Sequence, residues 1–356
     1  MWSKNEVNVT KKGCAWVKKI KICIVGCGAI GSWLGVHLGR CPQVEVSCLV
    51  RPSSVKQIRA TGLRVDSPSP SHSSLTLHPK LVSDNAHELG IQDWIILSVK
   101  ATSFLELVPE LIPMLSADTA IWTAMNGVPW WFMHGLDGPF KGNCFKTIDP
   151  NNLVQQSIPL HHWVGGVVHA SCSLIDKGHA MNHFGKGLLV GEPTGGPTQV
   201  TSSRVQAFTE LLTQAGFDAS ASTHIQKDIW YKLWGNMTMN PISALTGATI
   251  DKILEDPLLR EFVSGVMIEA KEIGSRIGLP IQQTPEDRHA VTAKLGAVKT
   301  SMLQDIESLK PLELDVLLSA VLEIASWIEA SCPLTSALLG LTRVKAQTLG
   351  LYKNQN

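Results

Sequence analysis

The sequence predicts an α/β domain followed by an all-helical domain. A short apolar run of β-branched character at residues 21–25 leads into a glycine-rich turn and then into a helical pattern. Strand-like and helix-like stretches alternate from there, which is typical of a sheet covered by helices. From Ile225 onward the apolar residues recur at helical spacing only. We therefore expect one domain at residues 20–222 and a second at residues 223–350.

The composition favours a globular protein that acts on a small molecule. A chain of 356 residues is long enough for two hydrophobic cores. Its net charge of +1 gives no field for nucleic acid or an anionic membrane, and no apolar run reaches the ~18 residues that cross a bilayer. The eight cysteines lack the paired spacing of a metal site. We interpret them as reduced thiols of a cytoplasmic protein.

Residues 1–19 precede the first predicted strand and are rich in lysine. They lack the apolar run of ~7–15 residues that a secretory signal requires. We predict a disordered N-terminal tail. A transit peptide is the alternative, although the stretch contains no arginine.

The glycine-rich turn predicts a dinucleotide site. It reads Gly26-Cys27-Gly28-Ala29-Ile30-Gly31 and lies between an apolar strand and a helix. Gly26 permits a tight turn, Gly28 lets the backbone approach a pyrophosphate, and Gly31 lets helix and strand pack closely. The amides that begin the helix would then hold the phosphates. We expect a Rossmann-like fold for this half of the chain.

The second strand, Val44–Val50, ends at Arg51, twenty positions after Gly31. An acidic residue here holds the ribose 2′-hydroxyl of NAD, whereas an arginine suits the 2′-phosphate of NADP. Ser53 and Ser54 follow Arg51 and also suit a phosphate. We therefore predict NADPH as the cofactor. A solvated arginine at a strand end is the alternative.

Two later strand patterns each end in a polar residue. Residues 93–99 lead to Lys100, and residues 120–125 lead to Asn126. Ligands bind beside the carboxyl ends of parallel strands, so Lys100 would touch the cofactor and Asn126 would lie near the nicotinamide. The alternative for each residue is a cap on a loop.

The stretch from Ile229 to Pro241 is the most informative part of the helical half. Lys232, Asn236 and Asn240 recur at spacings of four, so they lie along one helical face. An adjoining apolar stripe, which includes two tryptophans, would face a core. The apolar face would pack against the core, while the polar face would offer a cation and two amides to a ligand.

Helix propensity does not explain this composition, because Asn and Gly each cost up to ~1 kcal/mol relative to Ala. We expect Pro241 to interrupt the helix near Asn240 and the cleft to open there. These features favour a binding surface. A solvated stripe that keeps the helix soluble is the alternative.

Ser301 and Glu313 are two further polar positions in the helical half. Glu313 follows Pro311 and is expected in the first turn of a helix, where a carboxylate suits the helix dipole. Ser301 suits a helix cap. These structural roles explain both residues without catalysis, and a place in the site is the alternative.

These motifs, in this order, resemble the ketopantoate reductase (2-dehydropantoate 2-reductase) family. The similarity runs from about Ile20 to Ala330. It implies NADPH-dependent reduction of 2-dehydropantoate (ketopantoate) to pantoate, the reductive step of pantothenate biosynthesis. The matching segments are the glycine-rich turn, Lys100-Ala101, Asn126-Gly127, Trp230-Tyr231-Lys232-Leu233 with Asn236, Asn240 and Pro241, and Ser301-Met302-Leu303-Gln304-Asp305 with Glu313.

The resemblance also implies roles for the residues of the helical half. Lys232 would be the general acid, and Glu313 would hold a substrate hydroxyl. Ser301 and Asn240 would bind the substrate carboxylate and its surroundings. Asn236 would help to fix the lysine and the substrate.

For the first half of the chain, the resemblance implies that Arg51 and Lys100 contact NADP and that Asn126 lies beside the nicotinamide and the substrate. Two other functions stay open. One is a reductase of the same family acting on another branched 2-oxo acid, and the other is a protein that binds NADP(H) without turnover. A monomer and a homodimer are both consistent with an amphipathic helical domain.

Overall fold

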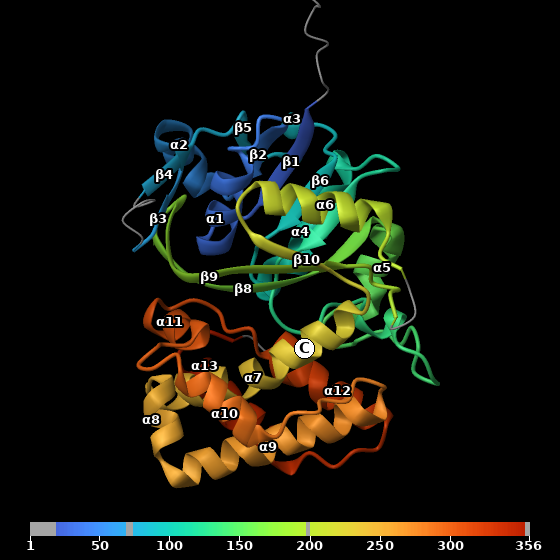
Figure 1. The fold of residues 1–356 in the computed structure, drawn as a ribbon, viewed down its shortest axis with the longest axis vertical. Coiled ribbons are helices and arrows are strands. Elements are labelled where there is room, and N and C mark those ends of the chain that lie inside the picture. Colours follow the sequence, from blue (N-terminus) through green and yellow to red (C-terminus); the bar gives the residue numbers. More distant parts are fainter. Residues whose placement is uncertain (1–18, 69–73, 197–199, 353–356) are drawn as a thin grey trace, which may run out of the picture.

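The computed structural model describes residues 19–68, 74–196 and 200–352. A sheet covered by helices forms the upper part of Figure 1, and a group of helices forms the lower part. This arrangement confirms the predicted fold class of a Rossmann-like α/β domain followed by an all-α domain. The predicted N-terminal tail lies outside the described residues, apart from Lys19.

The strands of the described residues form one sheet. Its order is β4-β3-β9-β8-β7-β6-β1-β2-β5, and β10 pairs with β9. The neighbours from β8 through β7, β6, β1 and β2 to β5 run parallel, whereas β9 is antiparallel to β8. The strand bounds are β1 Ile20–Val25, β2 Val44–Leu49, β3 Leu63–Asp66, β4 Ser74–Leu77, β5 Leu81–Ser83, β6 Trp94–Leu97, β7 Ala120–Thr123, β8 Trp163–Asp176, β9 His179–Gly191 and β10 Asp218–Ser222.

Two hydrophobic cores lie on opposite faces of the sheet. On β1, Ile22 and Ile24 belong to one core, whereas Cys23 and Val25 belong to the other. All four side chains are at most 1% exposed, as expected for a central parallel strand covered on both faces. The helices of this part are α1 Ala29–Leu38, α2 Pro52–Thr61, α3 Ala86–Leu89, α4 Phe104–Leu111, α5 Leu153–Ser157 and α6 Ser203–Gln214.

The remaining helices pack around α7. β10 ends at Ser222 and α7 begins at Ile225. The apolar stripe of α7 is buried as predicted, with Trp230 at 1%, Leu233 at 2% and Met237 at 0% exposure. The helix bounds are α7 Ile225–Thr246, α8 Ile250–Glu255, α9 Pro257–Arg276, α10 Pro285–Ala293, α11 Ser301–Glu307, the π-helix η7 Asp315–Ser319, α12 Ala320–Trp327 and α13 Pro333–Thr348.

The predicted break of α7 near Asn240 is wrong, because the helix continues through Pro241 as far as Thr246. Proline removes one backbone hydrogen bond and crowds the preceding turn. Ile242 and Ala244, beyond the proline, are only 2% and 3% exposed. Burial of this last segment of the helix offsets the local cost, because tertiary packing contributes more to helix stability than propensity does.

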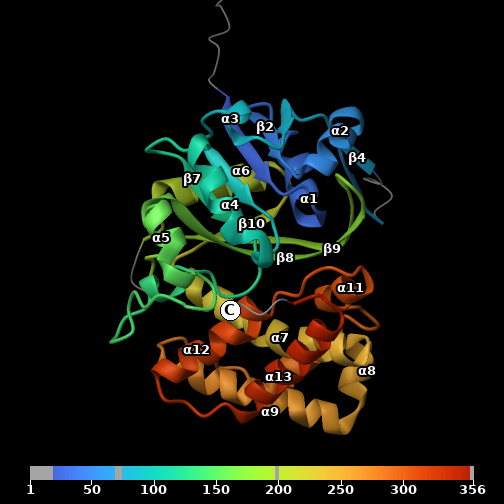
Figure 2. The same ribbon diagram turned by 180° about the vertical axis from the view of Figure 1, so that it is seen from behind.

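The two parts of the chain meet where β7 ends. The long strands β8 and β9 lie between the rest of the sheet and the helices α7 and α11 (Figures 1 and 2). Just after β7, the N–H of Val128 donates to the carbonyl of Val316 at 2.8 Å. Gly127 has a φ of +82°, and an added Cβ would lie 2.6 Å from the Cβ of Val316. Only glycine allows the β7 loop to approach η7 this closely.

Candidate active site

The glycine-rich turn between β1 and α1 forms an open cradle. Gly26 has a φ of +87°, and a Cβ on Gly31 would overlap the carbonyl oxygen of Gly26. A Cβ on Gly28, in contrast, would meet no atom within 4 Å. Gly28 precedes α1 and no side chain caps that helix. Its first amides are therefore left for a ligand, and this open space fits the phosphates of a dinucleotide.

The other residues of the turn serve its shape. Ala29 and Ile30 form the first turn of α1, and both are partly buried against the sheet. The carbonyl of Cys27 accepts a hydrogen bond from Ser32 Oγ at 3.1 Å.

Arg51 lies at the same edge of the sheet, directly before α2. Its side chain is exposed, and Nη2 lies 3.5 Å from the hydroxyl of Ser103, in the segment after β6. Ser53, in the first turn of α2, is also exposed. The predicted 2′-phosphate ligands are thus accessible and lie one strand away from the glycine-rich turn.

Lys232 crosses from α7 to the carboxyl edge of the sheet. Its Nζ donates to Asn126 Oδ1 at 2.7 Å and to the carbonyl oxygen of Val168 at 2.7 Å. Burial of the amine lowers the pKa of Lys232 to about 8, against the opposing effect of the negative charge of Glu313. The structure therefore brings the predicted acid and Asn126 together, and burial moves the pKa of this ammonium closer to neutral pH.

Asn240 and Ser301 also come together. Asn240 is 7% exposed, and its Nδ2 donates to Ser301 Oγ at 3.4 Å. Thr300, not Ser301, caps α11 by accepting from the N–H of Leu303, so the cap suggested for Ser301 is wrong. Asn236 lies one turn from each of Lys232 and Asn240 and is partly exposed. The polar stripe of α7 thus faces α11 at one end and the sheet at the other.

Glu313 connects the two halves of the molecule. It lies just before η7 rather than within the first turn of a helix, which corrects the predicted placement. Its Oε1 accepts from the N–H of Ala101 at 2.8 Å, and its Oε2 lies 3.6 Å from Lys100 Nζ. Glu313 is 9% exposed, so this carboxylate is held in place by contacts from the sheet side.

The ion pair of Asp305 was not expected from the sequence. Lys100 forms an ion pair with Asp305 of α11 as well as with Glu313, so its amine is turned toward the helical half. Burial raises the pKa of Asp305, although the positive charge of Lys100 opposes the shift. Asp305 belongs to a motif that was recognised, but no local signal pairs it with a residue 205 positions away.

Comparison with known proteins decides the family. The model of "Ketopantoate reductase PanE/ApbA" matches residues 22–195, and that of its C-terminal domain matches residues 224–346. The chain belongs to the ketopantoate reductase family. A 2-dehydropantoate 2-reductase from Mesorhizobium japonicum is 35% identical over 94% of this chain and 100% of its own length.

Solved structures agree with this ketopantoate reductase assignment. A protein from Ralstonia solanacearum MolK2, provisionally named a ketopantoate reductase, has 43% identity and a TM-score of 0.86 over 93% of this chain and 99% of its own. A D-mandelate dehydrogenase solved with NADH and anilino(oxo)acetate has 19% identity and a TM-score of 0.77 over 94% of this chain and 100% of its own. At that identity the second similarity concerns the fold alone.

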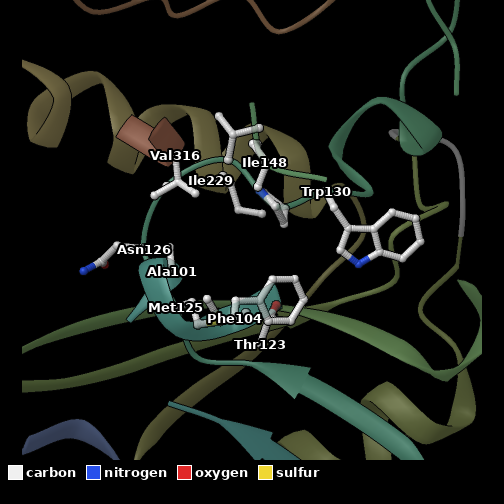
Figure 3. A pocket seen from close by; sticks show the side chains of 13 residues that line it. Ala101, Phe104, Thr123, Met125, Asn126, Trp130, Ile148, Ile229 and Val316 are labelled. Atoms are coloured by element: carbon white, nitrogen blue, oxygen red, sulfur yellow. The ribbon is translucent and has the colours of Figure 1, made fainter. Parts of the chain in front are cut away.

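An apolar cavity of about 40 Å³ adjoins the polar site of this ketopantoate reductase family member. Figure 3 shows Phe104 and Met125 on one side, Ile229 and Val316 on another, and Trp130 at one end. The amide of Asn126 points away from this cavity (Figure 3). The loop after β7 therefore separates an apolar space from the face on which Asn126 meets Lys232.

The described ranges contain no cluster of His, Cys, Asp and Glu that could hold a metal ion. Their cysteines are all free. None of the helices in these ranges is long and apolar enough to cross a membrane.

Proposed function

We propose that this protein catalyses the NADPH-dependent reduction of 2-dehydropantoate (ketopantoate) to pantoate. One observation carries the proposal: the amine of Lys232 reaches from the helical half to Asn126 and to the carbonyl of Val168, at the carboxyl edge of the sheet. A dinucleotide on the glycine-rich turn extends along this edge. The Mesorhizobium japonicum relative, named 2-dehydropantoate 2-reductase, supports the substrate.

The residues that would hold NADPH are the glycine-rich turn and Arg51. The space beside Gly28 admits the pyrophosphate, and Arg51 would hold the 2′-phosphate. Lys100 is proposed as a further contact, which requires its amine to turn from Asp305. When bound, the nicotinamide supplies a hydride to the ketone carbon of the 2-oxo acid.

Lys232 would stabilise the charge that develops on the ketone oxygen and would then donate a proton to it. Its two hydrogen-bond partners are a neutral amide and a neutral carbonyl, so they orient the amine without neutralising it. General-acid catalysis of this kind is commonly worth ~10²- to 10⁴-fold in rate. The pKa of Lys232, about 8, leaves the amine protonated at neutral pH and ready to release its proton.

The other polar residues would orient the substrate. Glu313 would accept a hydrogen bond from the distal hydroxyl of ketopantoate. Ser301 and Asn240, which already contact each other, are assigned to the carboxylate and its surroundings, and Asn236 to the lysine and the substrate. These assignments follow the family resemblance, and the closeness of the residues supports them.

The proposal includes a cytoplasmic location and the reductive step of pantothenate biosynthesis. A ketopantoate reductase from Staphylococcus aureus that is named as dimeric has a TM-score of 0.70 at 20% identity, and a homodimer is proposed for this chain. Light scattering at several protein concentrations would test the dimer.

Steady-state absorbance at the nicotinamide band tests the activity. Ketopantoate should give a higher kcat/KM than other branched 2-oxo acids, and NADPH a higher kcat/KM than NADH. If another branched 2-oxo acid gives a higher kcat/KM than ketopantoate, that acid becomes the proposed substrate. Failure to oxidise NADPH with any 2-oxo acid would favour the non-catalytic binding protein instead.

Arg51→Ala tests the cofactor assignment separately. It should lower the preference for NADPH over NADH, because the guanidinium is proposed to bind only the 2′-phosphate. An unchanged preference would place the phosphate contact elsewhere.

A further inference from the structure

Gly235 lies in the middle of α7, where glycine destabilises the helix relative to alanine. The structure gives a reason for it. A Cβ at this position would lie 2.6 Å from Nη2 and 3.0 Å from Nε of Arg288, which comes from α10. The absence of a side chain at Gly235 therefore leaves the space that the guanidinium of Arg288 occupies.

A second group holds the same guanidinium. The Cζ of Arg288 lies 4.9 Å from the ring centre of Tyr231, one turn before Gly235 on α7. A cation over an aromatic ring is stabilised by the charge distribution of the ring. α10 itself is fixed by the neighbouring His289, whose Nε2 lies 2.9 Å from Ser264 Oγ. The position of Arg288 is thus built by three elements: α7, α9 and α10.

Within the described part of the chain, Arg288 has no anionic partner. Among the residues that the structure describes, its guanidinium takes part in no ion pair and no hydrogen bond. Its Nε is buried and unpartnered. An unsatisfied buried donor is unfavourable and calls for an explanation. An acceptor supplied by a ligand would satisfy it.

Arg288 lies beside the segment of α7 that carries the proposed catalytic amine, because its guanidinium contacts Tyr231 and Gly235, which lie on either side of Lys232 in the helix. The pKa of His169 is lowered, first by desolvation of its ring and then by the positive charges of Lys232 and Arg288, although the residue as a whole is exposed. His169 directly follows Val168, whose carbonyl holds Lys232. Both cations therefore act on the middle of β8.

The charges around Lys232 are unevenly distributed. The negative charge of Glu313 acts on Lys232 from the side of β6. Asp305 lies on the same side, because Lys100 pairs with both carboxylates. Arg288, by contrast, contacts Tyr231 and Gly235 of α7, and its positive charge acts on His169 of β8. A 2-oxo acid is asymmetric in the same sense, because its carboxylate is anionic and the distal hydroxyl of ketopantoate is a neutral donor. A carboxylate is repelled by the acidic side and attracted by the basic side.

We propose that Arg288 binds the carboxylate of the 2-oxo acid substrate and so selects anionic over neutral ketones. The inference rests on the proposed reductase activity, and it adds a charged residue to a carboxylate site otherwise assigned to the neutral groups of Ser301 and Asn240. Arginine suits this role because its planar fork matches a carboxylate.

The first test compares a 2-oxo acid with the corresponding neutral 2-oxo amide. Arg288→Gln should lower kcat/KM for the acid about tenfold or more, mainly through KM, because hydrogen bonds to charged groups are worth more than neutral ones. It should leave kcat/KM for the amide within about twofold. Arg343→Gln, an exposed arginine on α13, is the matched control and should change neither value.

The second test moves Arg288 without changing it. Gly235→Ala places a methyl group where the guanidinium lies, while alanine strengthens the helix. The acid-over-amide preference should fall, and the midpoint of thermal unfolding should stay the same or rise. Gly340→Ala in α13, where an added Cβ meets no atom within 4 Å, is the control and should leave the preference unchanged.

A binding measurement keeps the inference testable without turnover. Calorimetric titration with pantoate and with pantoamide, each with NADP⁺ present, should show that Arg288→Gln weakens only the acid, about tenfold or more. An equal loss for both ligands would make Arg288 a structural residue and overturn the proposal, as would no loss for either. If the wild-type protein binds pantoate through Arg288 but reduces no 2-oxo acid, the proposed function fails and the carboxylate site stands.

Discussion

Two lysines connect the two halves of this molecule, and they do so in opposite ways. Lys232 reaches from α7 to the sheet and donates to the amide of Asn126 and the carbonyl of Val168. Lys100 reaches from the sheet to the helices and pairs with the carboxylates of Asp305 and Glu313. The residue type and the interface are the same. Only the charge of the partners differs.

This difference in partner charge distinguishes a lysine suited to catalysis from a lysine suited to a structural contact. Lys232 has no carboxylate among its hydrogen-bond partners, and burial lowers its pKa to about 8, so the amine is suited to proton transfer. The charge of Lys100 is balanced by two acids, which suits a contact that holds the halves together. An ammonium that must stabilise a developing anion cannot be occupied by a carboxylate already.

The largest expected effect is the loss of Lys232. Lys232→Ala should lower kcat at least about tenfold, and up to ~10⁴-fold if the full general-acid contribution is lost. The affinity for NADPH should change little, because the amine contacts no predicted phosphate ligand. Single-turnover absorbance and NADPH fluorescence titration measure the two quantities.

Lys100→Ala is the matched control for that substitution, since it removes the other lysine of the interface. Its kcat should fall much less. A near wild-type kcat for Lys232→Ala, or equal losses for the two variants, would remove the distinction between the lysines.

The pH dependence of kcat/KM tests the same contrast. Lys232 must be protonated to act as an acid, and its pKa is lowered to about 8, so kcat/KM should be flat below this pH and fall above it. The fall should approach tenfold per pH unit for a single essential proton. The residual activity of Lys232→Ala should lack this limb. A profile that stays flat well above pH 8 would assign the proton to another group.

The sequence alone predicts the features that depend only on neighbouring residues of the chain. The glycine-rich turn is recognisable because its steric requirements are local. Gly26 has a positive φ, and Gly31 packs against the carbonyl of Gly26. The polar and apolar stripes of α7 follow from helical spacing. The placement of Lys232 and Asn236 on one face of α7 therefore follows from the sequence alone.

The contacts across the interface could not be predicted in this way. The pairing of Lys100 with Asp305 and of Ala101 with Glu313 depends on how two separately folded surfaces meet. The continuation of α7 through Pro241 depends on burial of the segment beyond it. The sequence does not indicate the position of Arg288. Its guanidinium lies against Gly235, and this contact exists only when α10 packs against α7.

A smaller effect is expected at Glu313, which belongs to the Lys100 contact and to the proposed substrate site. Glu313→Gln should narrow the preference for ketopantoate over a 2-oxo acid without the distal hydroxyl, because an imperfectly paired buried group costs ~1–3 kcal/mol. The ratio of the two kcat/KM values measures this. If the ratio is unchanged while stability falls, Glu313 serves the interface only.

The smallest expected effect is the coupling between Lys100 and Asp305. The side chain of Lys100 is 31% exposed, so solvent screens the pair and a double-mutant cycle with Lys100→Met and Asp305→Asn should give a coupling of about 1 kcal/mol in unfolding free energy.

Salt and acid should both reduce this coupling. Added salt screens the pair because of its partial exposure. Burial raises the pKa of Asp305, so protonation should remove the coupling at a higher pH than for an ordinary aspartate. The sign is that of a carboxylate whose ionised form makes the contact: the coupling is present at neutral pH and is lost as pH falls. A coupling near zero at neutral pH and low salt would show that Lys100 does not hold the halves together.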